Sequence, residues 1–360
     1  MFKSVYGGTS GHDKVIENIS IGLNKLGYTV TIGSFLFLKD PPLNIPKIVL
    51  TRLGVLRNKE LEKFDIIHIH EAFVNYNFIF TNKPLVYHYH GINGLLQIIN
   101  LKFCLFFCHK KIKKIISVSK SGLKYLKPSQ DIPIEVISNG VNIQLFQKDI
   151  VKQVSKGKPQ LLFVGNLYSS KNVKMLINAM KTVLKEFPES HLQIVGSGET
   201  TNELDEIIGK LGLRKNIELV GQLSHNELKY YYSSCDVYIS ASTVEAHPLP
   251  PLEAMSSGKP LLLSNIPGHK ELIDESHAGL IFVNNNINDF FEKLEEILEK
   301  NQFYSSNALE YASRSDWSIT CKKISGVYEQ IMNRWILLDN FRIVKMLKNK
   351  ELFVIIFGVY

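Results

Sequence analysis

Two glutamates, Glu245 and Glu253, stand eight positions apart in a stretch whose flanks indicate how both are held. The run at 236–239 before them (DVYI) is β-branched and aromatic, as in a buried strand. Residues 252–257 suit a short helix, with prolines just before them for its first turn. The glutamates therefore flank the carboxyl end of a strand, where open α/β sheets bind their ligands.

Two carboxylates at such a place can accept hydrogen bonds from the hydroxyl groups of a sugar and a ribose. The same spacing also fits a solvated acid in a loop at 245 and an acid at 253 that the helix dipole favours. Spacing alone does not separate these two interpretations.

Lys171 is the candidate partner for a phosphate group. It comes just before residues 173–187, whose apolar stripe predicts a long helix. A lysine at a helix N-terminus is unfavourable for the helix dipole, so its position there suggests that it faces an anion such as a diphosphate. The alternative is a lysine that simply points into solvent.

Two glycine loops have the same anion-binding character. Gly7 and Gly8 precede a predicted helix, and Gly198 follows a predicted strand at 191–195. Free backbone N–H groups at a helix start favour anions, and glycine lets the backbone approach a phosphate or sugar closely. An ordinary turn is the alternative for the double glycine.

Several further motifs occur in a fixed order along the chain. With the glutamate-x7-glutamate pattern they resemble the retaining glycosyltransferases of the GT-B fold, family 4, over about residues 7–328. The matching segments are LLFVGNL at 161–167 with Lys171, VISNGVN at 136–142 with Phe146, FDIIHIH at 64–70, and HYHG at 88–91.

The resemblance implies an α/β protein of the GT-B class, with two Rossmann-like doubly wound domains facing across a cleft. The expected acceptor-side domain covers residues 1–150, and the nucleotide-sugar-binding domain covers 151–335. Residues 336–360 form a tail. The alternation of predicted strands and helices along the chain favours the same fold class.

The resemblance also implies roles for the catalytic candidates Glu245, Lys171 and His90. Glu245 would hold the donor-sugar hydroxyls and stabilise positive charge at the anomeric carbon, while Lys171 would stabilise the departing diphosphate. His90 would lie beside the donor sugar, although a histidine at a strand end is more often structural. Glu253 would bind the ribose hydroxyls.

The remaining donor-binding candidates supply backbone or amide groups. They are Gly8, Asn166, Gly198, His247 and Leu249.

The sequence departs from the family pattern at two positions. Asn166 replaces the usual arginine and brings no charge, so either donor binding is weaker or a cation such as Lys174 or Arg214 compensates. Pro248 replaces a glycine whose N–H faces the donor. Proline has no N–H, which leaves the amides of His247 and Leu249.

The expected function is therefore a retaining glycosyltransferase. It would move a sugar from a nucleotide-diphosphate sugar to a glycan, lipid-linked or other hydroxyl acceptor. The resemblance implies that no cofactor and no metal are needed, and no Asp-x-Asp pair lies in a suitable loop. A GT-B nucleotide-sugar epimerase and an inactive nucleotide-sugar-binding scaffold remain alternatives. A dinucleotide-dependent oxidoreductase is disfavoured because the Gly-x-Gly-x-x-Gly spacing after a first strand is absent.

Composition agrees with a two-domain enzyme. The chain has 360 residues, 45% of them hydrophobic, a net charge of +8 and a pI near 9.0. The charge suits nucleotide diphosphates or anionic lipids, and no nucleic-acid motif is present, so we expect no nucleic-acid partner. The four cysteines form no disulfide framework, which favours a reducing, cytoplasmic location.

Residues 95–114 combine an apolar segment with a basic cluster at 109–114. We favour a core helix with a solvated basic end. Peripheral contact with the inner face of a membrane is the alternative. Cys104 and Cys108 in this segment suit small core residues better than metal ligands.

The first domain poses a problem of topology. Only residues 1–6 precede Gly7, too few for the strand that should run into the glycine loop near the centre of the sheet. Residues 352–359 are apolar and β-branched, and we hypothesise that they supply this strand, parallel and between the strands at 28–35 and 66–70. Residues 340–360 would then complete the first domain. A misread start and a membrane-contacting tail are the alternatives.

Overall fold

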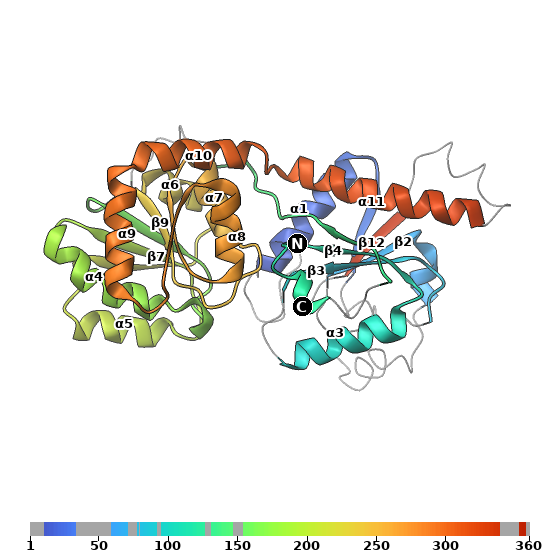
Figure 1. Cartoon of the computed structure of the whole chain (residues 1–360), viewed down its shortest axis with the longest axis horizontal. Helices are drawn as coiled ribbons and strands as arrows, with labels where there is room; N and C mark the ends of the chain where they lie inside the picture. The colour runs from blue at the N-terminus through green and yellow to red at the C-terminus, as the bar shows by residue number, and fades with distance from the viewer. Residues whose placement is uncertain are drawn as a thin grey trace. The chain divides into compact units, whose positions relative to one another are not determined.

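The computed structural model describes residues 11–33, 59–70, 78, 80–91, 95–126, 131–146, 154–338 and 353–357. The chain divides into two compact units. The first unit comprises Met1–Asn139 with Trp317–Tyr360, and the second comprises Gly140–Asp316. Each unit contains a six-stranded parallel sheet with helices packed on it (Figure 1). This is the doubly wound α/β architecture that the sequence predicts.

The sheet of the first unit has the order β1-β12-β2-β3-β4-β5. Its helices α1 and α11 lie on one face and α3 on the other (Figure 1). The elements are α1 (Gly11–Lys25), β1 (Thr29–Gly33), η1 (Lys59–Lys63), β2 (Ile66–Ile69), β3 (Leu85–Tyr89), α3 (Leu95–Cys108), β4 (Ile112–Ser117), η3 (Leu123–Tyr125), β5 (Ile134–Val136), α11 (Trp317–Leu338) and β12 (Phe353–Phe357).

Strand β12 confirms the hypothesis about the C-terminal segment. It pairs in parallel with β1, where Val30 is the partner of Val354, and with β2, where Val354 is the partner of Ile66. Val354 is fully buried. The C-terminal strand therefore satisfies the backbone of both neighbours in the core of the sheet.

The second unit has the order β11-β10-β9-β6-β7-β8. Buried apolar clusters cover both faces of this sheet, as expected for parallel strands. The elements are β6 (Gln160–Val164), η5 (Ser169–Lys171), α4 (Val173–Glu186), β7 (His191–Val195), α5 (Thr201–Lys210), β8 (Ile217–Gly221), α6 (His225–Ser234), β9 (Val237–Ser240), α7 (Leu249–Ser256), β10 (Leu261–Ser264), α8 (Pro267–Ser276), β11 (Gly279–Phe282), α9 (Ile287–Glu299) and α10 (Asn301–Ser313).

The division into units differs from the sequence-based boundaries at both ends of the second unit. It begins at Gly140 and ends at Asp316, whereas 151–335 was expected. The difference arises because α11 packs on α1 of the first unit, where Cys321 Sγ lies 3.8 Å from the carbonyl oxygen of Ile19. Residues 353–357, expected in a tail, belong to the first sheet.

No helix in the described part of the chain combines the length and the apolar character that crossing a bilayer requires.

Candidate active site

The topology of the second unit creates a switch point between β6 and β9. From β6 the chain moves outward through β7 and β8, and it then returns to β9 on the other side of β6. The loops that leave the carboxyl ends of β6 and β9 therefore diverge, and ligands of open α/β sheets bind at such a point. Lys171 ends η5, in the connection after β6, and Glu245 lies in the loop after β9.

Lys171 and Glu245 form an ion pair across this switch point. Lys171 Nζ donates to Glu245 Oε1, and the two side chains are 23% and 15% exposed. The loops are also joined by Thr243, whose N–H and hydroxyl both donate to the carbonyl of Ser170, at 2.8 and 3.1 Å. The structure thus brings together two of the catalytic candidates on two loops that hydrogen bonds join to each other.

Glu253 lies in α7 and is 6% exposed. The Tyr232 hydroxyl donates to Glu253 Oε2 at 2.7 Å. Burial, and then the nearby Glu253 carboxylate, raise the pKa of Tyr232 well above its usual value, so the hydroxyl stays protonated and remains a donor. Tyr232 therefore orients the carboxylate that the sequence assigns to ribose binding.

The negative charges of Glu245 and Glu253 both affect the pKa of the buried Tyr238 hydroxyl. Burial raises the pKa of Tyr238 well above its usual value, and Glu245 and Glu253 raise it further. The hydroxyl donates to the carbonyl of Val164 at 3.3 Å. The two carboxylates therefore lie at the same end of the sheet, around the carboxyl end of β6.

The backbone that carries Glu245 rests on the first turn of α8. A Cβ placed on Gly268 would lie 2.4 Å from the carbonyl oxygen of Glu245 and 2.6 Å from that of Ala246. No side chain fits in this space, so glycine is required for the helix to approach the loop.

His269 lies next to Gly268 and is fully buried. Its Nδ1 is 3.1 Å from both the hydroxyl and the carbonyl oxygen of Ser264. Burial lowers the pKa of His269 to about 4, and the charges of Glu245 and Lys171 act on it in opposite directions. A neutral imidazole therefore stands within electrostatic reach of the ion pair.

The start of α7 offers few backbone donors. Pro248 is its N-cap residue, and prolines follow Leu249, which begins the helix. Because proline lacks an N–H, Leu249 is the residue in the first turn of this helix that carries a backbone donor, and its contact with a donor molecule stays a prediction. His247 is 7% exposed, and burial lowers its pKa to about 4.

The loop at Gly198 differs from the expectation of an open anion site. The Gly198 N–H donates to Thr201 Oγ1 at 3.0 Å, so this amide is already engaged. A Cβ on Gly198 would lie 2.4 Å from the carbonyl oxygen of Leu167, which explains the glycine by packing. Asn166 lies in the adjoining loop, and its carbonyl accepts from the N–H of Tyr168 at 3.0 Å.

The two cations suggested as replacements for the missing arginine form ion pairs with acidic residues of α5. Lys174 Nζ lies 3.3 Å from Glu203, and Arg214 lies 2.7 Å from Asp205. Both ion pairs are exposed, and neither of them includes Lys171 or Glu245. The structure therefore gives no support to compensation by these two side chains.

His90 belongs to the first unit and lies directly after β3. Its Nε2 is 2.8 Å from His70 Nδ1, and the ring of His12 meets it edge-on at 4.3 Å between centroids. Burial lowers the pKa of His90 well below its usual value, so it is neutral. Gly8 lies outside the described residues.

Sequence reasoning missed three groups of this site: Tyr232, Tyr238 and His269. Each comes from a different element, and no spacing in the sequence connects them with the glutamates. A buried tyrosine is usually a core residue, so only their contacts show that they hold or surround the carboxylates.

Comparison with known proteins identifies the family. The profile of glycosyl transferases group 1 matches residues 146–316, and that of glycosyltransferase family 4 matches residues 9–145. The chain belongs to this family of glycosyltransferases, and its fold is GT-B.

An uncharacterized glycosyltransferase of Methanocaldococcus jannaschii is 27% identical, over 76% of this chain and 77% of its own length. An alpha-monoglucosyldiacylglycerol synthase of Streptococcus pneumoniae is 28% identical, over 41% of this chain and 36% of its own length. Anabaena HepE, solved with UDP and glucose, shares the fold with a TM-score of 0.73 at 18% identity, over 91% of this chain and 98% of that one.

Proposed function

We propose that this glycosyltransferase uses a nucleotide-diphosphate sugar and retains the configuration of the transferred sugar. The observation that carries the proposal is the Lys171–Glu245 pair at the switch point, with the buried Glu253 carboxylate at the same end of the sheet. The solved relative with bound UDP and glucose supports the donor class.

Each charged group has a role in the proposed reaction. Lys171 stabilises the negative charge that develops on the leaving diphosphate, which is electrostatic stabilisation by a fixed donor. Glu245 accepts hydrogen bonds from the donor sugar and stabilises positive charge at the anomeric carbon. Glu253, oriented by Tyr232, accepts hydrogen bonds from the ribose. The acceptor hydroxyl attacks the anomeric carbon on the face that the diphosphate leaves.

The donor is tested with a panel of nucleotide sugars. A nucleotide sugar present at one hundred times its dissociation constant should stabilise the native protein by about 2.7 kcal/mol. The anomeric configuration of the product, read by proton NMR, should match that of the donor. An inverted product would contradict retention, and release of an epimerised free sugar without an acceptor would favour the epimerase alternative.

One observation favours the scaffold alternative. Asn166 carries no charge, and Lys174 and Arg214 form ion pairs with Glu203 and Asp205 of α5, so neither of them adds its charge to that of Lys171 at the switch point. Tight nucleotide-sugar binding without transfer to any acceptor would support a binding protein instead of an enzyme.

We further propose that the acceptor is lipid-linked and that α3 holds the protein on an anionic membrane surface. Leu101, Cys104 and Cys108 of α3 are buried in the first unit's core, which confirms the expected core helix. The opposite face, however, exposes a group of apolar side chains: Ile99, Phe103, Phe106 and Phe107, with Phe106 78% exposed.

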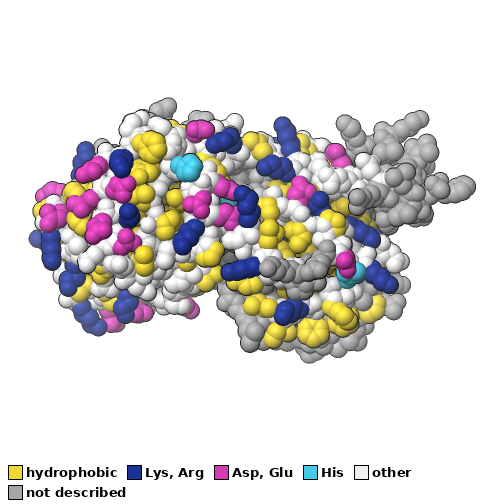
Figure 2. All heavy atoms as spheres, in the orientation of Figure 1, with side chains coloured by type: hydrophobic (Ala, Val, Ile, Leu, Met, Phe, Trp, Pro, Cys, Tyr) yellow, Lys and Arg dark blue, Asp and Glu magenta, His cyan; other side chains and the backbone are white. Residues whose placement is uncertain are grey.

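A basic segment follows this apolar face directly. Lys110, in the turn after α3, and Lys113, near the start of β4, are exposed, and Figure 2 shows hydrophobic side chains beside basic ones on this part of the first unit. Apolar side chains that insert between lipids, next to lysines that meet anionic headgroups, form an interfacial anchor. The synthase of Streptococcus pneumoniae, whose name states a diacylglycerol product, supports a lipid acceptor.

Vesicle sedimentation tests the anchor. The protein should bind vesicles containing anionic lipid more strongly than neutral ones, and Phe106→Ser should weaken this binding about tenfold to a hundredfold, because a buried phenylalanine contributes about 1.5–3 kcal/mol. Phe303→Ser is the control, since Phe303 is 59% exposed on α10 of the second unit. Equal losses in both variants would exclude a specific surface on α3.

A further inference from the structure

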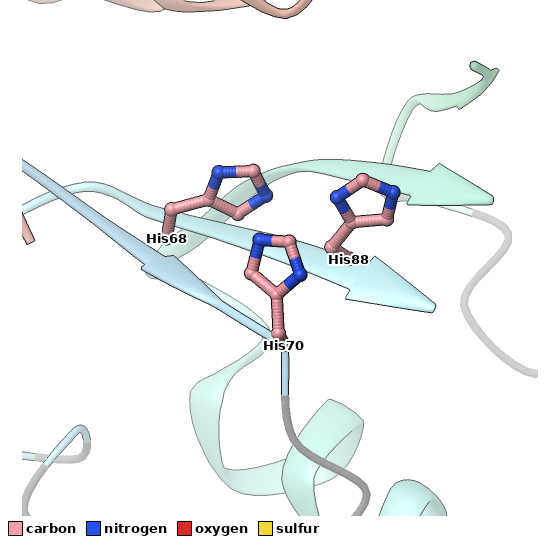
Figure 3. Close-up of side chains that lie close together, drawn as sticks. All are labelled: His68, His70 and His88. Carbon is pink, nitrogen blue, oxygen red and sulfur yellow. The ribbon is translucent and has the colours of Figure 1, made fainter. Parts of the chain in front are cut away.

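Three histidines of the first unit face one another within its core (Figure 3). His68 lies in β2 and His70 directly after it, on the same face of the sheet because side chains alternate along a strand. His68 is the partner of Val86, so His88 of β3 stands beside residue 70. The three residues are 0%, 1% and 2% exposed.

The outward nitrogens of two of these rings are held in place. His68 Nδ1 lies 2.6 Å from the Tyr328 hydroxyl of α11, and His70 Nδ1 lies 2.8 Å from His90 Nε2. These contacts fix the ring orientations and turn the other nitrogen of each ring inward. A second polar group that fixes the ring in this way is the usual arrangement around a metal-binding histidine.

Four ring nitrogens of these histidines have no hydrogen-bond partner among the described residues. They are His68 Nε2, His70 Nε2 and both ring nitrogens of His88. Buried polar atoms normally have a partner, and several unpartnered ones at one place indicate a missing ligand. The ring centroids lie 4.4 to 5.2 Å apart, with His68 and His88 stacked and His70 tilted against both, so the unpartnered atoms are gathered in one small volume.

The spacing suits a metal ion. One nitrogen from each ring can be chosen so that all three lie within 4.8 Å of one another. Zinc–nitrogen bonds of about 2.0–2.1 Å in a tetrahedron require nitrogens about 3.3 Å apart, so the three rings would move closer together when the ion binds. Burial lowers the pKa of each ring, which keeps the imidazoles neutral, and the neutral form is the one that binds metal.

We propose that His68, His70 and His88 bind one divalent transition-metal ion, of which zinc is the best match to three imidazoles. The ion would join β2 to β3 inside the first unit, and through Tyr328 it would also fix α11 on the sheet. Through His70 it would hold His90, the histidine that the family resemblance implies would lie beside the donor sugar. The ion would stabilise the fold of the first unit and position His90. It would take no part in the electrostatic stabilisation proposed for Lys171 and Glu245.

Metal titration of the full chain tests the proposal. Protein stripped with a chelator should take up one zinc ion per chain, measured by elemental analysis after dialysis. Cobalt(II) in the same protein should give the intense visible absorption of a tetrahedral site with nitrogen ligands. His88→Gln should abolish binding, and His109→Gln, an exposed histidine of the same unit, should leave it unchanged.

Tyr328→Phe separates metal binding from general packing. It removes only the hydroxyl that holds His68, and it should weaken zinc affinity about tenfold or more. Failure of wild-type protein to retain zinc or cobalt would overturn the proposal, as would full stoichiometry in folded His88→Gln. If the His88 variant does not fold, the wild-type cobalt spectrum decides, because a sulfur-to-metal charge-transfer band would assign the ion to Cys104 and Cys108 instead.

Discussion

Lys171 and Glu245 neutralise each other in the structure, and this pairing determines how each contributes. In the proposed reaction, an arriving diphosphate would compete with the glutamate for the same ammonium group. Once the diphosphate bound the lysine, the glutamate carboxylate would be available to accept hydrogen bonds from the sugar. The pair would therefore change partners on donor binding, and its two members should respond differently to substitution.

Glu245→Gln should keep or increase the affinity for the nucleoside diphosphate, because it leaves the Lys171 charge without its partner. Turnover should fall by about 10²- to 10³-fold, as on loss of an electrostatic stabiliser of the transition state. Calorimetry of the nucleotide and initial-rate kinetics measure the two effects. A parallel loss of nucleotide affinity would contradict the exchange of partners.

At the scale of elements, the site depends on how closely two segments approach. The first turn of α8 supports the carbonyls of Glu245 and Ala246, and only a residue without a Cβ fits there. The position of Glu245 is therefore set by a helix that contributes none of the proposed catalytic side chains.

Gly268→Ala should displace the loop that carries Glu245 and lower turnover at least tenfold, while the fold persists. Gly326→Ala in α11 is the matched control, since a Cβ there meets nothing within 4 Å and alanine favours the helix. Kinetics and circular dichroism of both variants provide the measurement. Full activity in Gly268→Ala would show that the loop is not held by this contact.

The elements themselves were largely predictable from the sequence. The apolar stripe of α4 and the β-branched strands follow from periodicity, and the composition of residues 353–357 was sufficient to place β12. The start of α7 at Leu249 instead of 252 follows from the prolines of its first turn. Contacts between distant elements were not predictable from the sequence. The roles of Tyr232 and His269, and the clustering of unpartnered histidine nitrogens, were therefore found only in the structure.

At the scale of the whole molecule, buried neutral histidines make stability depend on pH. His247 and His269 have pKa values of about 4, below the ordinary value of 6.5. Between these values the unfolded chain binds protons that the native protein does not. Their contribution to stability is therefore complete above about pH 6.5 and is lost as the pH falls toward 4.

Lowering the pH from 7 to 5 should remove about 2 kcal/mol of stability for each of these two groups. His269→Gln carries no titrating ring, so the stability difference between wild type and this variant should shrink by about that amount. Urea unfolding at both pH values measures it. A difference that is the same at pH 7 and pH 5 would contradict the buried neutral state of His269.

The proposed donor site lies at the switch point of the second unit. It is tested most directly by measuring nucleotide binding in three variants. Titration calorimetry of the nucleoside diphosphate should show affinity reduced about tenfold to a hundredfold in both Glu253→Gln and Lys171→Ala, because each loses a charge-assisted hydrogen bond worth about 1.5–3 kcal/mol. Lys174→Ala, whose partner is Glu203 on α5, should bind like the wild type. Unchanged affinity in both Glu253→Gln and Lys171→Ala would contradict the donor site.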